Sequence, residues 1–201
     1  PQNCSTAVDS CNWCPCVDDV GFIELMLDRL ETGFCIDRRR VFATGFSSGA
    51  MMTYRLACES DRFAAIAPVG GTLARGFNCS PAGHNAVSLL HIHGSRDRYV
   101  DVINETSQDG YHYEPLADVI ASWADHQGCE DRISAFNTPF DGVGGLACTQ
   151  HANCGSGAEV AACWWRGAHS WPDTGERFGT RLIWQFFQRN PQPVLIQANA
   201  D

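Results

Sequence analysis

Residues 45–49 place a serine between two glycines, each two positions away from it, in the pattern Gly-x-Ser-x-Gly. An apolar run at 41–44 precedes this pentapeptide, and a run with helical character follows it from residue 50. A serine hydroxyl becomes a good nucleophile when a sharp strand-to-helix turn holds it exposed, near a base and the helix N-terminus. The stretch therefore predicts a nucleophile elbow around Ser47. Gly45 and Gly49 would serve the turn, because a side chain at either position is expected to collide with the neighbouring chain.

An acyl-transfer serine also needs a base, and the base needs a carboxylate to orient it. Hydrolases with this elbow have the three residues in the chain order Ser, Asp, His. Asp97 follows an apolar run at 87–94, and His169 follows another at 160–165. The carboxyl ends of parallel strands share one edge of a sheet. We therefore expect Ser47, Asp97 and His169 to meet there as nucleophile, orienting carboxylate and base.

Several other residues are candidates for roles beside this triad. Asp101 lies in the same loop as Asp97 and is the alternative carboxylate. The backbone N–H of Ser48, next to the nucleophile, is the expected first donor of an oxyanion hole. Tyr99 and Trp171 flank the expected Asp and His, so they predict an aromatic wall that binds substrate. The alternative interpretation is that both rings only pack their loops.

Two further histidines, His91 and His93, alternate along one apolar run and would face the same way in a strand. Two such imidazoles can chelate a metal, but no third ligand lies near them in the sequence. Cys11, Cys14 and Cys16 are the other possible ligand cluster, and no second cluster at ligand spacing follows. We therefore predict that the two histidines pack in the core, and we assign no metal site.

The elements that must position these residues alternate between short apolar strands and amphipathic helices. Strands are expected at 41–44, 63–69, 87–94 and 160–165, with a short one near 146–148, and helices at 20–30, 50–59, 116–127 and 176–189. This alternation predicts an α/β fold with a mostly parallel sheet flanked by helices. We expect a single domain over residues 1–201, in which 1–16 form a cysteine-rich loop and 190–201 a loose tail.

Composition excludes several classes of partner and indicates a compartment. The net charge of −9, without a cluster of Lys and Arg, argues against binding to nucleic acid or to an anionic membrane. No apolar run approaches the roughly 20 residues that span a bilayer. The 11 cysteines are spread along the whole chain, which suits disulfides in an oxidising compartment. The sequence therefore predicts a secreted, disulfide-bonded protein.

With these stretches assembled, the chain resembles the secreted α/β-hydrolase esterases that include feruloyl esterases and poly(3-hydroxybutyrate) depolymerases. The stretches that carry the resemblance are VDDVGF (17–22), RVFATGFSSGAMM (40–52), YRLAC (54–58), FAAIAPV (63–69), HIHGSRD (91–97) and GAHSWP (167–172). The resemblance implies an α/β-hydrolase fold and a triad of Ser47, Asp97 and His169. It further implies hydrolysis of carboxylic esters through an acyl-enzyme, without a cofactor.

Three functions follow as hypotheses. The first is a feruloyl esterase that acts on hydroxycinnamoyl esters of the plant cell wall, because the expected aromatic wall suits that acyl group. The second is a depolymerase of poly(3-hydroxybutyrate) or another polyester. The third, from a different class, is a hydrolase-like binding domain without catalytic activity, because a second oxyanion donor is not visible in the sequence.

The same resemblance suggests some disulfides. It pairs Cys58 with Cys79 and Cys129 with Cys154, and we add a bridge between Cys148 and Cys163 on neighbouring strands. An odd number of cysteines leaves one thiol over. The sequence does not decide the partners of five cysteines, namely Cys4, Cys11, Cys14, Cys16 and Cys35.

The chain departs from the family at its start. Family members have several strands before the first helix, and a loop after one of them supplies the second oxyanion N–H. Here residues 1–16 carry no strand pattern. We therefore expect the strand before the elbow to lie at an exposed edge of the sheet, unless another segment such as residues 193–196 covers it.

Overall fold

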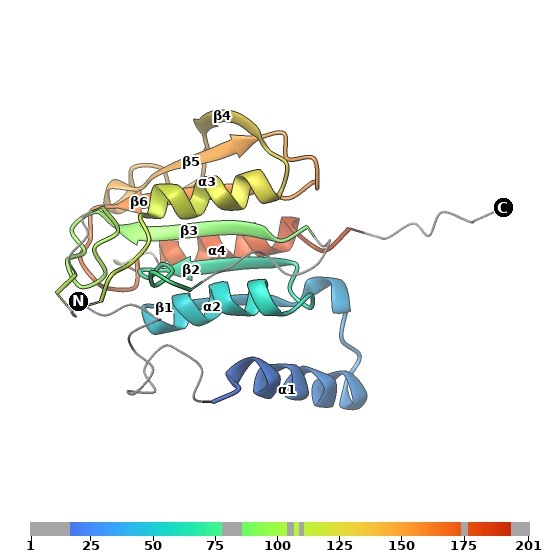
Figure 1. Ribbon diagram of the computed structural model, residues 1–201. Coiled ribbons are helices and arrows are strands. Elements are labelled where there is room, and N and C mark those ends of the chain that lie inside the picture. The colour runs from blue at the N-terminus through green and yellow to red at the C-terminus, as the bar shows by residue number, and fades with distance from the viewer. Residues whose placement is uncertain (1–16, 78–85, 104–106, 109–110, 174–176, 194–201) are drawn as a thin grey trace.

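In the computed structural model, which describes residues 17–77, 86–103, 107–108, 111–173 and 177–193, a twisted sheet forms the centre of the protein (Figure 1). Its strands within those ranges, in spatial order, are β1 (Phe42–Phe46), β2 (Ala65–Val69), β3 (Ser88–Gly94), β6 (Val160–Trp165), β5 (Ala147–Ala152) and β4 (Glu130–Ala135). The first four pair in parallel, and β5 and β4 continue the sheet antiparallel. The predicted, mostly parallel sheet is confirmed.

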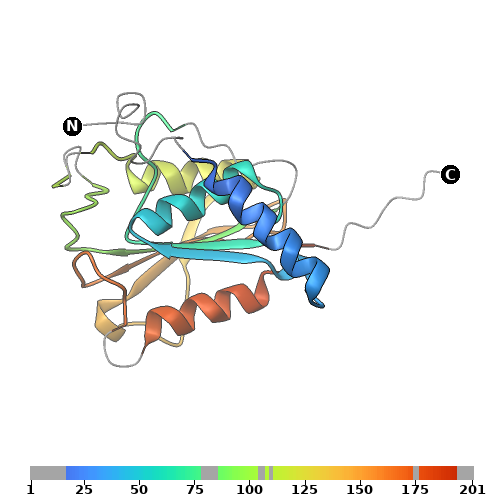
Figure 2. The ribbon, with the colours of Figure 1, turned by 90° about the horizontal axis from the view of Figure 1, so that it is seen from below.

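Helices cover both faces of this sheet. α1 (Asp19–Gly33), α2 (Ser48–Glu59) and α3 (Leu116–His126) lie on one side, and α4 (Phe178–Arg189) lies on the other (Figure 2). Two short 3₁₀ helices, η1 (Arg38–Arg40) and η2 (Val143–Gly145), lie in connections. The result is the three-layer α/β arrangement that the alternation of strands and helices predicts.

The sequence pattern of each element explains its place in these layers. β2 and β3 are buried at every position, which is why they read as continuous apolar runs. α4 instead buries one stripe at helical spacing, including Leu182 and Phe186, and leaves Trp184 58% exposed on the other side. Phe187 of this stripe stacks on Phe42 of β1, with 4.7 Å between ring centroids.

Side chains alternate along β3 and divide the core into two parts. Leu89 belongs to the apolar cluster beneath α2 and α3, whereas Leu90 and Ile92 belong to the cluster beneath α4. The same alternation places His91 and His93 on the side of α2 and α3. The predicted burial of both histidines in the core is confirmed, because their exposed fractions are 0% and 1%.

One strand, and the full length of another, differ from what the sequence pattern predicts. β4 was not predicted, because all six of its residues are exposed and its sequence, EDRISA, has no apolar alternation. β1 continues two residues past the predicted strand, to Phe46. Within the described residues it pairs with β2 alone, so it lies at the expected sheet edge. Residues 1–16, and the tail residues 194–196 proposed to cover this edge, lie outside the described ranges.

Two of the predicted disulfides are present. Cys129 is bonded to Cys154, and Cys148 is bonded to Cys163, its direct partner across β5 and β6. Cys58 is also disulfide-bonded, but its expected partner Cys79 lies outside the described residues. In the part of the chain that is described, the free and exposed cysteine is Cys35, while Cys4, Cys11, Cys14 and Cys16 lie outside that part.

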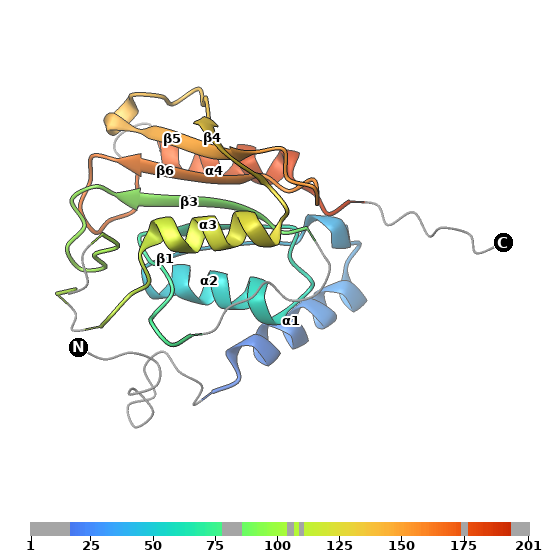
Figure 3. The ribbon, with the colours of Figure 1, turned by 45° about the horizontal axis from the view of Figure 1, so that its top comes forward.

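Parallel strands bring the candidate residues to one place. β1, β2, β3 and β6 run in the same direction, so their carboxyl ends, and the loops that follow them, lie along one edge of the sheet (Figure 3). Ser47 follows β1, Asp97 follows β3, and His169 follows β6.

None of the described helices is both long enough and apolar enough to cross a membrane.

Candidate active site

Ser47 occupies a sharp turn between the end of β1 and the start of α2. Its φ of 56° and ψ of −115° are rare for a residue with a side chain, and such strain persists only where the surroundings enforce it. Its N–H donates to the carbonyl of Val69 in β2 at 2.9 Å, and its own carbonyl accepts from the Ala50 N–H at 2.9 Å. The neighbouring strand and the first turn of α2 therefore hold the serine in place.

Glycines permit the close approach of the chain segments at this turn. A Cβ atom on Gly45 would lie 2.3 Å from the carbonyl oxygen of Gly49, so the expected collision at position 45 is confirmed. At Gly49 the expectation is wrong, because the added Cβ would meet no described atom within 4 Å apart from its chain neighbours and the nearby backbone of its own helix. Gly71, which the pattern analysis did not single out, is equally constrained, since its Cβ would lie 2.3 Å from the Ser47 carbonyl oxygen.

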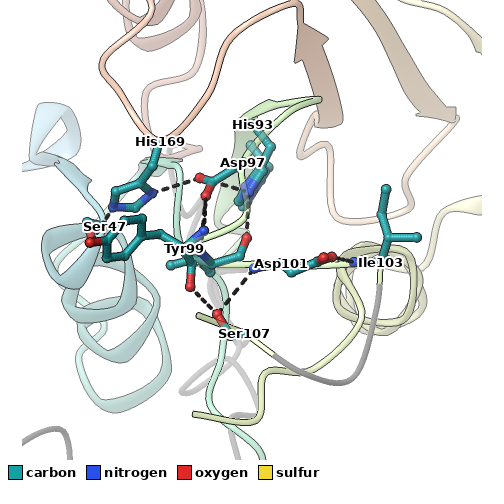
Figure 4. A network of polar contacts seen from close by, with 10 residues as sticks. Ser47, His93, Asp97, Tyr99, Asp101, Ile103, Ser107 and His169 are labelled. Carbon is teal, nitrogen blue, oxygen red and sulfur yellow. Dashed lines mark hydrogen bonds and ion pairs between the residues drawn. The ribbon is translucent and has the colours of Figure 1, made fainter. Parts of the chain in front are cut away.

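Asp97 is held by the turn that follows β3. Its Oδ1 atom accepts hydrogen bonds from the backbone N–H groups of Tyr99 and Val100, at 2.9 and 3.0 Å. Its Oδ2 atom faces two imidazoles, His169 at 2.7 Å and His93 at 3.4 Å (Figure 4). The side chain is 1% exposed, so a buried carboxylate is surrounded by donors on both of its oxygens.

These donors determine the charge of the carboxylate. Burial by itself raises the pKa of Asp97, but hydrogen bonds from His93, His169 and the Val100 N–H outweigh it and hold the pKa below its ordinary value. Asp97 therefore remains a carboxylate near neutral pH. An ionised, acceptor-only group is what is needed to fix the orientation of a neighbouring imidazole.

His169 joins the serine to this carboxylate. Its Nδ1 atom lies 2.7 Å from Asp97 Oδ2, and its Nε2 atom lies 2.9 Å from Ser47 Oγ (Figure 4). Because the carboxylate only accepts, Nδ1 carries the proton. In the neutral ring, Nε2 is then free to accept a proton from the serine hydroxyl. A hydrogen-bonded chain thus connects the three residues that the sequence analysis singled out.

The loops after β3 and β6 meet closely enough to form this chain. The Arg96 N–H donates to the Gly167 carbonyl at 2.8 Å. A Cβ atom on Gly94 would lie 2.5 Å from the Ala168 carbonyl oxygen, so a glycine at the end of β3 lets the His169 loop approach. Gly94 is therefore a position at which the approach of the two loops requires glycine, and its residue type alone did not identify it.

Of the two candidate carboxylates, the structure joins Asp97 to the imidazole. The Oδ1 atom of Asp101 accepts from the backbone N–H of Ile103 at 3.0 Å, and its own N–H faces Ser107 Oγ (Figure 4). Ser107 in turn donates to the Tyr99 carbonyl. Asp101 thus contributes to the fold of the loop that carries Asp97.

Two aromatic rings lie beside the His169 imidazole, and only one of them, Tyr99, was predicted from the sequence. Tyr99 lies beside the His169 ring, with 5.5 Å between centroids and 25° between planes, and it is 57% exposed. Phe46, which the sequence analysis missed, lies 4.7 Å from the same ring. Trp171 instead donates its Nε1–H to Thr180 of α4 and packs with the core beneath that helix. Substrate binding by Tyr99 and Trp171 stays a prediction.

The N-terminus of α2 lies directly beside the serine. Ser48 is the first residue of this helix and is exposed. The first N–H groups of a helix have no intrahelical acceptor, and the helix dipole is positive at that end. The Ser48 N–H is thus available for a developing negative charge. Its role as an oxyanion donor stays a prediction.

No set of three or more His, Cys, Asp or Glu side chains gathers at metal-binding distance in the described ranges. The buried histidines of β3 contact other groups instead. Tyr54 Oη lies 2.7 Å from His91 Nδ1, and His91 Nε2 lies 3.1 Å from His93 Nδ1. The contact of His93 with Asp97 was missed, because the sequence shows on which face of β3 a residue lies but not how a later loop folds back onto it.

Comparison with known proteins identifies related chains. Residues 20–132, more than half of the chain, match the model of the phospholipase/carboxylesterase family of α/β-hydrolases. Feruloyl esterase C of Emericella nidulans is 28% identical over 173 residues, which is 85% of this chain and 57% of that protein. Feruloyl esterase D of Neurospora crassa is 28% identical over 179 residues, which is 86% of this chain and 56% of that protein. The chain thus spans somewhat more than half the length of these relatives.

A solved structure shares the fold. The acetyl xylan esterase from Aspergillus awamori superposes with a TM-score of 0.56 over 84% of this chain and 66% of that protein, at 17% sequence identity. At that identity the likeness concerns the α/β-hydrolase fold alone.

Proposed function

Because the chain belongs to the phospholipase/carboxylesterase family of α/β-hydrolases, we propose that it is a serine hydrolase of carboxylic esters. The observation that carries the proposal is the hydrogen-bonded chain from Ser47 Oγ through His169 to Asp97, with distances of 2.9 and 2.7 Å. A nucleophile, a base and an orienting carboxylate in this arrangement perform acyl transfer on several unrelated folds.

The proposed reaction has two halves. His169 takes the Ser47 proton at Nε2 while Oγ attacks the ester carbonyl, and the imidazolium then protonates the departing alcohol. Asp97 keeps the imidazole in the required tautomer and stabilises its positive charge. The Ser48 N–H, at the positive end of α2, donates to the oxyanion. Water then repeats the path and releases the acid from the acyl-enzyme.

For the substrate we propose a hydroxycinnamoyl ester, such as those of the plant cell wall. Relatives at about 28% identity over most of this chain carry the name feruloyl esterase. The half-exposed Tyr99 ring beside His169 offers a flat surface against which an aromatic acyl group can stack. We further propose that residues 1–201 fold as one domain. We also propose that the protein is secreted, because disulfides such as its Cys129–Cys154 and Cys148–Cys163 bonds persist in oxidising compartments.

The proposed mechanism is tested with a fluorophosphonate probe and p-nitrophenyl acetate. We expect the probe to label the wild-type protein and turnover to be measurable, and we expect Ser47→Ala to abolish both. Ser48→Ala is the matched control, because it keeps the backbone N–H on which the mechanism depends. A folded wild-type protein that is never labelled would instead support a hydrolase-like binding domain.

The substrate is tested by comparing kcat/KM for methyl ferulate with kcat/KM for short 3-hydroxybutyrate oligomers. We expect methyl ferulate to be preferred, because its flat ring can use Tyr99. A preference for the oligomers would replace the proposed substrate with a polyester and leave the esterase mechanism intact.

A further inference from the structure

A buried hydrogen-bonded relay ends at the Val100 carbonyl, beside the carboxylate of the proposed triad. It runs from Tyr54 Oη to His91 Nδ1 at 2.7 Å, and from His91 Nε2 to His93 Nδ1 at 3.1 Å. His93 Nε2 then faces the Val100 carbonyl at 3.1 Å and Asp97 Oδ2 at 3.4 Å. The two imidazole rings stack with 11° between their planes. The mechanism proposed above uses none of the first three side chains.

The acceptors at the end of the relay determine the direction of every donor in it. A carbonyl and a carboxylate only accept, so His93 Nε2 carries a proton and, in the neutral ring, His93 Nδ1 accepts. His91 Nε2 must then donate, which leaves His91 Nδ1 as the acceptor for the Tyr54 hydroxyl. All three side chains therefore donate toward Asp97, and no second arrangement of the neutral groups satisfies them all.

The surroundings keep His91 and Tyr54 neutral. Burial, reinforced by the neighbouring His93, holds the pKa of His91 well below its usual range. Burial also raises the pKa of Tyr54. The titratable groups that face His93 are His91 and Asp97, with His169 beyond the carboxylate, and from β6 the neighbour is the uncharged ring of Trp164.

We propose that His93 is a positioning residue for Asp97, directed by the relay from Tyr54 through His91, and that it holds the carboxylate in the orientation that His169 requires. This inference rests on the proposed triad. The two imidazoles converge on Oδ2, while two backbone N–H groups hold Oδ1. Tyr54 lies on α2, the helix that begins beside Ser47, so the relay also ties the helix next to the nucleophile to the carboxylate.

A kinetic experiment tests the relay through substitutions of His93. His93→Leu removes the donor at similar volume, and His93→Gln keeps an N–H in a comparable place. We expect His93→Leu to lower kcat about 10- to 100-fold with little change in KM, as for other groups that orient a reactive residue through a neighbour. We expect His93→Gln to recover most of the loss. His126→Leu, the same change on an exposed residue at the end of α3, is the control and should leave kcat unchanged.

The titration of Asp97 itself separates positioning from a merely structural role. Without the His93 donor the pKa of Asp97 rises, so the carboxylate is protonated at higher pH. In ¹³C-aspartate-labelled protein, the titration of the Asp97 carboxyl should therefore move to higher pH in His93→Leu. It should stay in place in His93→Gln. A folded His93→Leu protein with the wild-type kcat and an unmoved Asp97 titration would overturn the proposal.

A spectroscopic measurement on the unsubstituted residues covers the case in which His93→Leu does not fold. In ¹⁵N-histidine-labelled wild-type and Ser47→Ala protein near neutral pH, His91 and His93 should both be neutral, with the proton on Nε2. A protonated His93, or a proton on Nδ1 of either ring, would refute the relay. Tyr54→Phe removes the first donor and should alter the His91 signals and lower kcat by a smaller factor.

The two proposals fail in different ways. If Ser47→Ala retains ester hydrolysis, the proposed function is wrong, and the tautomers of His91 and His93 remain measurable. If hydrolysis depends on Ser47 but not on His93, and the tautomers are not those expected, only the relay is wrong.

Discussion

At the scale of single residues, the site depends on which atoms can donate and which can only accept. Asp97 accepts from two backbone N–H groups and faces two imidazoles, whereas Asp101, four residues further along the loop, accepts from the Ile103 N–H. The sequence placed both aspartates in one loop, and it predicted Asp97 with Asp101 as the alternative. The distance of 2.7 Å to His169 favours Asp97 as the functional carboxylate.

Asp97→Asn tests this assignment. The amide nearly preserves the shape, but it supplies no negative charge and can stabilise the wrong tautomer of His169. We expect kcat to fall by about four orders of magnitude. Asp101→Asn is the matched control in the same loop and should change kcat by less than about tenfold, because its hydrogen bond to the Ile103 N–H lies within the loop. Equal losses in the two variants, measured with p-nitrophenyl acetate, would contradict the assignment.

A second prediction at this scale concerns the Tyr99 ring. Tyr99→Ala should raise KM for methyl ferulate several-fold, because an aromatic pair contributes about 0.5–1.5 kcal/mol beyond its buried area. KM for p-nitrophenyl acetate, whose acyl group has no ring, should change less. Tyr99→Phe keeps the ring and should behave like the wild type. An equal rise in KM for both esters in Tyr99→Ala would argue against stacking on the acyl group.

At the scale of elements, the turn between β1 and α2 shows how backbone packing produces the site. β1 ends at Phe46 and α2 begins at Ser48, so Ser47 alone connects the strand to the helix, with a positive φ. The turn needs glycine where two backbone segments touch, which is at Gly45. The same residue type at Gly49 faces open space instead.

Two glycine substitutions should therefore have opposite effects on stability. Gly45→Ala places a methyl group 2.3 Å from a backbone carbonyl oxygen, and we expect it to destabilise the fold by about 3 kcal/mol and to disturb Ser47. Gly49→Ala lies within α2, where alanine is the better helix former, so it should stabilise by up to about 1 kcal/mol. Thermal unfolding measures both, and a loss of stability in Gly49→Ala would show that the open space is needed.

At the scale of the whole molecule, disulfide bonds stabilise β4 and β5, the antiparallel strands of the sheet with the most exposed residues. All residues of β4 are exposed, and β4 and β5 extend the sheet away from the site. The Cys129–Cys154 bond joins the residue before β4 to the loop after β5, and the Cys148–Cys163 bond joins β5 to β6. These bonds fasten the antiparallel part of the sheet to the parallel part.

Removing one of these bonds should lower stability without removing activity. Cys129 and Cys154 are 25 residues apart, and closing a loop of that length stabilises a folded protein by about 3.5 kcal/mol in the chain-entropy model. The double variant Cys129→Ala/Cys154→Ala should unfold at correspondingly lower guanidinium concentration. Cys35→Ala, which removes a free and exposed thiol, is the control and should leave the midpoint unchanged. Unaltered stability in the double variant would contradict a structural role for the bond.

The sequence by itself predicted most strands and helices, the elbow at Ser47, and the places of Asp97 and His169 just after their strands, because these depend on local periodicity and on short motifs. It did not reveal β4, the close contact at Gly71 or the donor from His93 to Asp97. Those features depend on where loops distant in the sequence fold back, and only tertiary packing decides that. Only tertiary structure shows that Asp97 lies 2.7 Å from the His169 imidazole, because a hydrogen bond depends on distance and direction, and these differ between two carboxylates of one loop.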